Sequence, residues 1–156
     1  MTLEIIKAGA PILKQTAAPV ARVDAKTRTL LDQMAETMKA ADGVGLAAPQ
    51  VGVSIRAVVI DVGEGLLEMV NPEITAREGE TIDSEGCLSV PGIFGDVVRA
   101  ESVRVTYTDR RNKRKSLKAK GLLARCIQHE VDHLNGILFI DIATSLRQEE
   151  KEAKGA

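Results

Sequence analysis

The sequence has 156 residues, of which 44% are hydrophobic, 28% charged and 2% aromatic, and its formal net charge is −1. This composition excludes a disordered chain and is typical of a globular protein, and the length suits one domain over residues 1–156. Without Trp, and with one Tyr and two Phe, the chain lacks the aromatic residues of a base-stacking surface, so we expect no specific nucleic-acid partner.

An amphipathic helix is predicted from Asp24 to about Ala41, because apolar residues recur there at helical spacing: Leu30, Leu31, Met34 and Met38. Asp24 is the candidate N-cap, and Gly43 lies where a glycine would stop the helix.

Strands are predicted on both sides of this helix. Residues 3–9 form a short opening strand or extended segment, and the β-branched run 55–62 predicts a buried strand. Residues 66–75 predict another extended segment, broken at Asn71-Pro72. Residues 101–109 alternate apolar and polar side chains, which is the period of a half-buried strand.

The last part of the chain predicts a turn, a second helix and a tail. Residues 110–121 turn near Asn112 and return, and residues 122–134 have helical spacing that ends at Asn135-Gly136. Residues 137–141 predict a short strand or extended segment, and the charged tail 142–156 predicts a short helix. Strands gathered around two helices indicate an α+β fold.

The sequence also carries expectations about its compartment. It has no signal-like apolar region at its start and no apolar run near the roughly 20 residues that span a bilayer. We therefore expect a cytoplasmic protein without a membrane partner, whose two cysteines, Cys87 and Cys126, stay unpaired in a reducing environment.

Both histidines of the chain lie in one helical segment. His129 and His133 are four residues apart, so they share a helix face, and Glu130 follows the first. A histidine pair at this spacing is often structural. The intervening glutamate favours an H-E-x-x-H site instead, with two metal ligands and a general base.

Such a site needs a third protein ligand and an open position for water or substrate. Glu149 and Glu150 lie in a hydrophilic tail. Cys126 shares the histidine face, but a metal level with residue 131 would lie about 7.5 Å from it along the helix axis, beyond the roughly 5 Å that a cysteine reaches. Cys126 is better interpreted as a small buried residue. Cys87 could bring its thiolate to the helix, or be an ordinary buried thiol.

Three segments occur in the order found in one enzyme family: residues 43–50 (GVGLAAPQ), 85–89 (EGCLS) and 128–136 (QHEVDHLNG). They resemble the signature motifs of the peptide deformylases, and the resemblance extends to residue 141. It implies an α+β fold in which antiparallel β-strands surround a central metal-binding helix, with an N-terminal amphipathic helix.

The resemblance also implies the site and the reaction. One divalent metal, usually Fe²⁺ in this family with Zn²⁺, Ni²⁺ or Co²⁺ as alternatives, would be held by Cys87, His129 and His133. Glu130 would be the general acid and base, and Gln50 with the backbone N–H of Leu88 would form the oxyanion site. The implied reaction removes the formyl group from the N-terminal formylmethionine of nascent peptides and releases formate.

Further residues are assigned with an alternative beside each. Val44, Gly45, Leu122 and Cys126 are candidates for substrate binding, with plain core packing as the alternative. At Gly45 the substrate backbone would approach closely. Glu85 and Asp132 are candidates for carboxylates that orient the loop or the helix, with a solvated Asp132 as the alternative.

The sequence leaves two rival functions open. A zinc peptidase would use the same helix with a carboxylate as the third ligand, so Cys87→Ser would leave its metal content nearly intact. A non-catalytic relative would bind metal without releasing formate, and the presence of Glu130 and Gln50 argues against it.

Residues 110–120 hold seven Lys and Arg residues and no acid. A solvated hairpin explains them, and the alternative is a patch that orients the enzyme near ribosomal RNA. The tail after Asp141 is shorter than the long C-terminal helix of many bacterial deformylases, so we do not expect a ribosome-docking role of that helix here.

Overall fold

A computed structural model of the chain describes residues 1–148. The helices are η1 (Pro11–Lys14), α1 (Ala25–Ala40), η2 (Ala48–Val51), α2 (Gly121–Leu134) and α3 (Phe139–Ile142). The strands are β1 (Gly45–Ala47), β2 (Ala57–Ile60), β3 (Leu67–Glu78), β4 (Thr81–Cys87), β5 (Val90–Arg99), β6 (Ser102–Thr108), β7 (Arg114–Lys120) and β8 (Ser145–Gln148).

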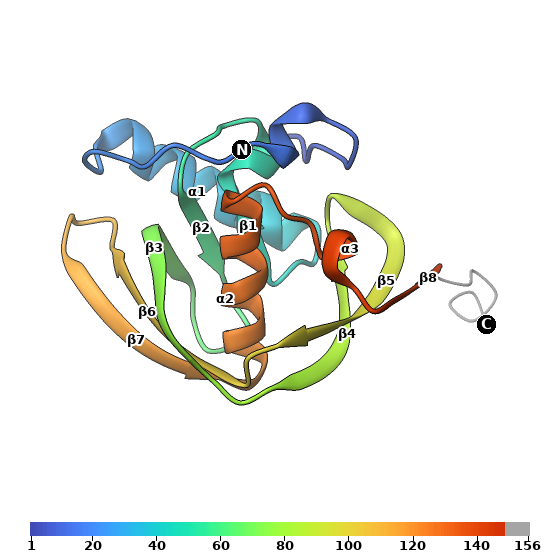
Figure 1. Ribbon diagram of the computed structural model, residues 1–156. Helices are drawn as coiled ribbons and strands as arrows, with labels where there is room; N and C mark the ends of the chain where they lie inside the picture. The colour runs from blue at the N-terminus through green and yellow to red at the C-terminus, as the bar shows by residue number, and fades with distance from the viewer. Residues whose placement is uncertain (149–156) are drawn as a thin grey trace.

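The strands form two antiparallel sheets. One has the order β1-β2-β3-β6-β7 and the other β4-β5-β8. Figure 1 shows α2 in the middle of the molecule, with β6 and β7 on one side and β4 and β5 on the other. The predicted α+β class is confirmed, and the helix with both histidines lies where elements of both sheets can reach it.

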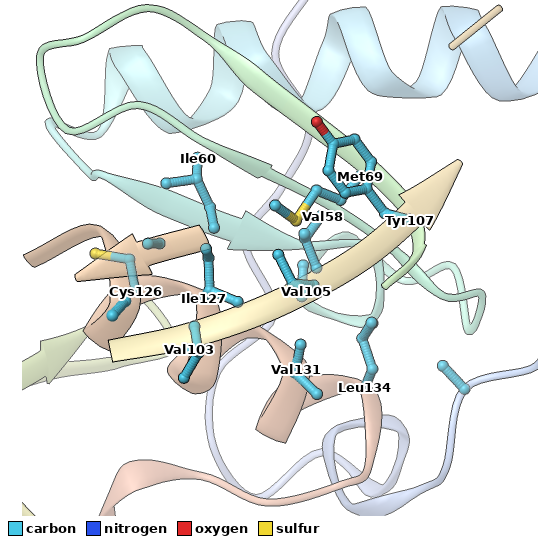
Figure 2. Close-up of a cluster of buried hydrophobic side chains, with 14 residues drawn as sticks. Val58, Ile60, Met69, Val103, Val105, Tyr107, Cys126, Ile127, Val131 and Leu134 are labelled. Atoms are coloured by element: carbon cyan, nitrogen blue, oxygen red, sulfur yellow. The ribbon is translucent and has the colours of Figure 1, made fainter. Parts of the chain in front are cut away.

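One face of α2 packs on the five-stranded sheet. Ile127, Val131 and Leu134 of α2 belong to a buried cluster with Val103 and Val105 of β6, as Figure 2 shows. Burying such aliphatic side chains stabilises the fold by about 1.5–3 kcal/mol each. This face fixes the rotation of α2, so the face with the histidines points away from the larger sheet.

The first helix begins as predicted but ends differently. The Asp24 side chain accepts a hydrogen bond from the Thr27 backbone N–H at 2.9 Å, which confirms Asp24 as N-cap. At the other end Asp42, with φ of 57°, occupies the left-handed position, and the Gly43 N–H bonds to the Met38 carbonyl. Asp42 therefore ends the helix in a Schellman motif, and the prediction that Gly43 takes that position was wrong.

The strands β2, β6 and β7 lie within the predicted segments, and Asn112 turns β6 into β7 with a φ of 63°. The predicted break at Asn71-Pro72 is instead a register shift inside the continuous strand β3, where Asn71 has a φ of 51°. An irregularity of this kind bends a strand without ending it. The opening segment is not a strand, but its Ile6 N–H bonds to the Gln50 carbonyl at 2.7 Å.

Two predictions near the C-terminus were wrong. Residues 137–141 were expected to be extended, whereas Phe139–Ile142 forms α3. The expected helix after Asp141 is replaced at Ser145–Gln148 by β8, which pairs with β5; the rest of that prediction, residues 149–156, lies outside the described residues. Among residues 1–148, no helix is long and apolar enough to cross a membrane.

Candidate active site

The helix α2 and the hairpin of β4 and β5 bring three metal-ligand side chains together. Ligand atoms of Cys87, His129 and His133 all lie within 4.8 Å of one another. The Cys87 Sγ lies 3.3 Å from the His133 Nε2. A thiolate and two imidazoles at this spacing are typical donors for zinc or iron.

Cys87 is the last residue of β4 and lies at the turn into β5. Its sulfur accepts a hydrogen bond from the Ser89 backbone N–H at 3.4 Å and from the Gln50 side-chain amide at 3.6 Å. The sulfur thus faces fixed donors as well as the histidines. Cys126, on α2, is buried and does not belong to the cluster found within residues 1–148, in agreement with the helix geometry.

Gln50 is held in one orientation by its neighbours. Its Oε1 accepts from the Ala47 backbone N–H at 2.9 Å, and its Nε2 donates to the Ser89 Oγ at 3.0 Å. Because Gln50 and Ser89 are both buried, these bonds fix which end of the amide faces Cys87. The donor N–H₂ group is the end that faces the site.

Glu85 connects His129 to two arginines. Its carboxylate lies 2.9 Å from the His129 Nδ1, and it accepts from Arg99 at 2.9 Å and from Arg125 at 2.6 Å. Burial alone would raise the pKa of Glu85, but hydrogen bonds from His129 and Arg99 outweigh it and lower that pKa to about 2. Arg99 also bonds to Asp132 at 2.5 Å. Glu85 therefore orients His129 directly, whereas the partly exposed Asp132 reaches it only through Arg99 and Glu85.

The two histidines differ in protonation. Burial opposes charge on His129, but hydrogen bonds to Cys87 and Glu85 raise its pKa to about 10. A metal ion would replace the proton on the ring nitrogen that faces Cys87. Burial lowers the pKa of His133 well below its ordinary value, so His133 is neutral with a lone pair available.

Glu130 lies beside this cluster with a free acceptor. The residue is 4% exposed, and its Oε1 has no hydrogen-bond partner among residues 1–148. Burial raises the pKa of Glu130 to about 7, so the carboxyl group can both take and give a proton near neutral pH.

Gly45 is the reason that Glu130 can lie there. A Cβ at Gly45 would come within 2.5 Å of the Glu130 Oε2. A side chain at this position would displace the carboxylate. The structure therefore gives a second cause for the glycine, beside the expected approach of a substrate backbone.

A cleft of about 610 Å³ opens onto the site. It is lined by the predicted residues Val44, Gly45, Leu88, Leu122 and Cys126, together with Gln50, Cys87, His129 and Glu130. Val44 and Leu122 are 44% and 57% exposed, so neither is a core residue. Apolar side chains that are accessible inside a cleft suit the side chain of a bound molecule.

A family model described as polypeptide deformylase matches residues 2–149 of the sequence. The chain belongs to the polypeptide deformylase family. The peptide deformylase of Pelotomaculum thermopropionicum is 57% identical to it over 93% of this chain and 94% of that protein. The one from Desulfitobacterium hafniense is 54% identical over 90% and 93%.

Solved structures of the family share the fold. The peptide deformylase from Thermotoga maritima has a TM-score of 0.91 and 41% identity, covering 93% of this chain and 99% of that one. The enzyme from Synechococcus elongatus in complex with actinonin has a TM-score of 0.89 and 46% identity, covering 92% and 79%. The predicted resemblance to peptide deformylases is confirmed, and the chain is an enzyme of this family rather than a zinc peptidase.

Several residues of this deformylase site were missed from the sequence. Arg99 and Arg125 supply the charge that buried Glu85 requires, Ser89 orients Gln50, and Phe94 lines the cleft. Arg125 left a usable signal in its spacing, because it lies four residues before His129 and so on the same helix face, and Ser89 is the last residue of the 85–89 motif. Arg99, Ser89 and Phe94 belong to the β4–β5 hairpin, whose glycines and turn formers concealed its two strands.

Proposed function

We propose that this chain is a metal-dependent hydrolase that removes the formyl group from the N-terminal formylmethionine of nascent polypeptides and releases formate. The observation that supports it most is the buried Glu130 carboxylate, with its unpaired Oε1, beside the cluster of Cys87, His129 and His133. Hydrolysis of an amide requires that water lose a proton and that the leaving amine gain one, and one carboxyl group can do both in turn.

The donors present fit a divalent metal ion. The cluster offers one sulfur and two imidazole nitrogens within 4.8 Å of one another. Cys87, His129 and His133 would hold the ion, Fe²⁺ by family resemblance, with Zn²⁺, Ni²⁺ or Co²⁺ able to use the same donors. When bound, the ion supplies Lewis acidity, which lowers the pKa of water and stabilises negative charge that develops on oxygen.

Groups of the protein itself would transfer the protons and stabilise the oxyanion. Glu130, a buried carboxyl group whose pKa burial raises, takes a proton from the attacking water and later gives one to the leaving amine. The Gln50 amide, which is held with its N–H₂ toward Cys87, and the Leu88 backbone N–H would donate to the formyl oxygen as it gains charge. Donors fixed before the reaction lower the barrier because they need no reorganisation.

The cleft offers a binding place for the first side chain of the substrate. Val44, Leu122 and Cys126 offer apolar surface for the unbranched methionine chain, and Gly45 lets the substrate backbone pass close to Glu130. We further propose that residues 1–156 form a single catalytic domain that acts in the cytoplasm, where formylated nascent chains appear.

Formate release from formyl-Met-Ala-Ser by anaerobically purified, Fe²⁺-loaded protein tests the proposal. We expect rapid release of formate from this peptide. The control, acetyl-Met-Ala-Ser, should be a poor substrate, because its extra methyl group crowds the oxyanion site. Absence of formate from a fully metallated protein would contradict the proposed reaction.

The basic segment 110–120 supports a second, separate proposal, that this edge of the molecule approaches ribosomal RNA. Arg104 of β6 and Lys118 of β7 are direct cross-strand partners on the exposed face, and like charges so placed repel unless an anion lies over them. Arg110 is different, since it pairs with Asp32 and Glu68.

Replacing Arg104, Arg114, Lys118 and Lys120 together by Gln should therefore weaken sedimentation with ribosomes without changing turnover of the free tripeptide. Unchanged co-sedimentation at low and physiological salt would leave the solvated hairpin as the explanation of these charges.

A further inference from the structure

Arg125 joins the helix with both histidines to the hairpin with Cys87. It lies on α2 one turn before His129, and it is 7% exposed. All three of its acceptors belong to the hairpin: the Glu85 Oε2 at 2.6 Å, the Val97 carbonyl at 2.9 Å and the Thr81 carbonyl at 3.2 Å. One side chain thus connects α2 to both β4 and β5.

Neutralising Glu85 does not by itself account for Arg125. Arg99 already bonds to both carboxylate oxygens of Glu85, at 2.9 Å each. A second buried guanidinium is costly to desolvate, and two of its three bonds go to backbone carbonyls rather than to the acid. Its planar fork of donors suits three acceptors held at fixed angles.

The contact between Arg125 and the hairpin affects the distance between the candidate metal ligands. Cys87 is the last residue of β4 and His129 lies four residues after Arg125 on α2, so the position of the hairpin along α2 sets the gap between sulfur and imidazoles. Of the charged side chains of α2, Arg125 is the one that bonds to backbone of both hairpin strands in the part of the chain that the structure describes.

We propose that Arg125 is a positioning residue that sets the distance between Cys87 and the two histidines, and so determines metal affinity. This inference rests on the proposed metal-dependent function. Arg125 and Leu122 of α2 line the cleft together with Phe94 of the hairpin, so a shift of the hairpin along α2 would change the proposed methionine pocket as well.

The test uses Co²⁺ binding to Arg125→Met and Arg125→Lys. Affinity is measured against a chelator of known strength, and the thiolate-to-cobalt absorption band reports the Cys87 bond separately from activity. We expect Arg125→Met to weaken Co²⁺ binding by about 10- to 100-fold, the range found when groups that orient ligands are lost. Arg125→Lys should recover only part of this, because an ammonium group cannot reach three acceptors in a fork.

Arg110→Met is the matched control, since it also removes an arginine that bridges two elements, α1 and β3, but away from the site. It should leave Co²⁺ affinity and the absorption band unchanged. Thermal unfolding shows whether each variant is folded. If Arg125→Met does not fold, Arg125→Lys still gives an informative result.

Full recovery of affinity and absorption band by Arg125→Lys would overturn the proposal, because charge alone would then be sufficient. Unchanged Co²⁺ affinity in a folded Arg125→Met would overturn it too. A wild-type protein that binds no Co²⁺ would instead refute the proposed metal site, and the two failures are thereby distinguished.

Discussion

Replacing Glu130 by Gln is expected to lower the rate constant for formate release by about 10²- to 10⁴-fold, the usual contribution of a general acid–base group. The amide keeps the size of the side chain but cannot accept the proton of water. Steady-state release of formate from formyl-Met-Ala-Ser, measured beside metal content, checks the prediction. Retained metal with lost turnover assigns the proton transfer to Glu130.

The pH dependence gives a second readout of the same group. Burial raises the pKa of Glu130 to about 7 in the protein without metal, and a nearby divalent cation favours the charged form and lowers it again. As a base Glu130 must be ionised in the free enzyme, so kcat/KM should fall as pH decreases through a midpoint between the ordinary value of 4.5 and about 7. A rate that stayed constant down to pH 4 in a folded, metallated enzyme would be incompatible with this role.

Replacing Cys87 by Ala is expected to remove most of the bound metal. Loss of groups that merely orient ligands costs about 10- to 100-fold in affinity, so loss of a direct ligand should cost more than about 100-fold. Metal content after dialysis against a weak chelator, measured by atomic emission, gives the result. Turnover should disappear with the metal.

Cys126→Ala is the matched control for that experiment, because it removes the other thiol of the chain. Cys126 is buried, and burial raises the pKa of its thiol to about 12, so it stays protonated. Its replacement should leave metal content intact. If instead Cys87→Ala retained metal and Cys126→Ala lost it, the assignment of the third ligand would be reversed.

The parts of the site carried by α2 could be predicted because helix spacing converts directly into geometry. Residues four apart on a helix share a face, so His129 and His133 could be placed together from their spacing alone. The rise per residue likewise excluded Cys126 as a ligand of the same metal. Likewise Asp24 could be named as N-cap from its local sequence. In each case the interaction spans few residues, so no tertiary information is needed.

The parts carried by the β4–β5 hairpin could not be predicted in this way. Its glycines, such as Gly86 and Gly95, indicate turns locally, yet both lie inside strands, where side chains of Phe94 and Leu146 take the space that a Cβ would fill. Arg99 approaches Glu85 only once β4 and β5 have paired. Nothing in the spacing of these residues encodes that contact, and only the family resemblance assigned Cys87 to the site.

The division of the proposed ligand set between α2 and the hairpin would also link metal binding to folding. Cys87 and His133 are 46 positions apart, so bringing them together has a loop-closure cost in the unfolded chain that local helix formation does not have. An ion that binds only after the hairpin has docked stabilises the docked state by mass action, in proportion to the logarithm of its free concentration. The same ion would then act as a tertiary cross-link, and a cell short of metal would hold a less stable protein as well as a less active one.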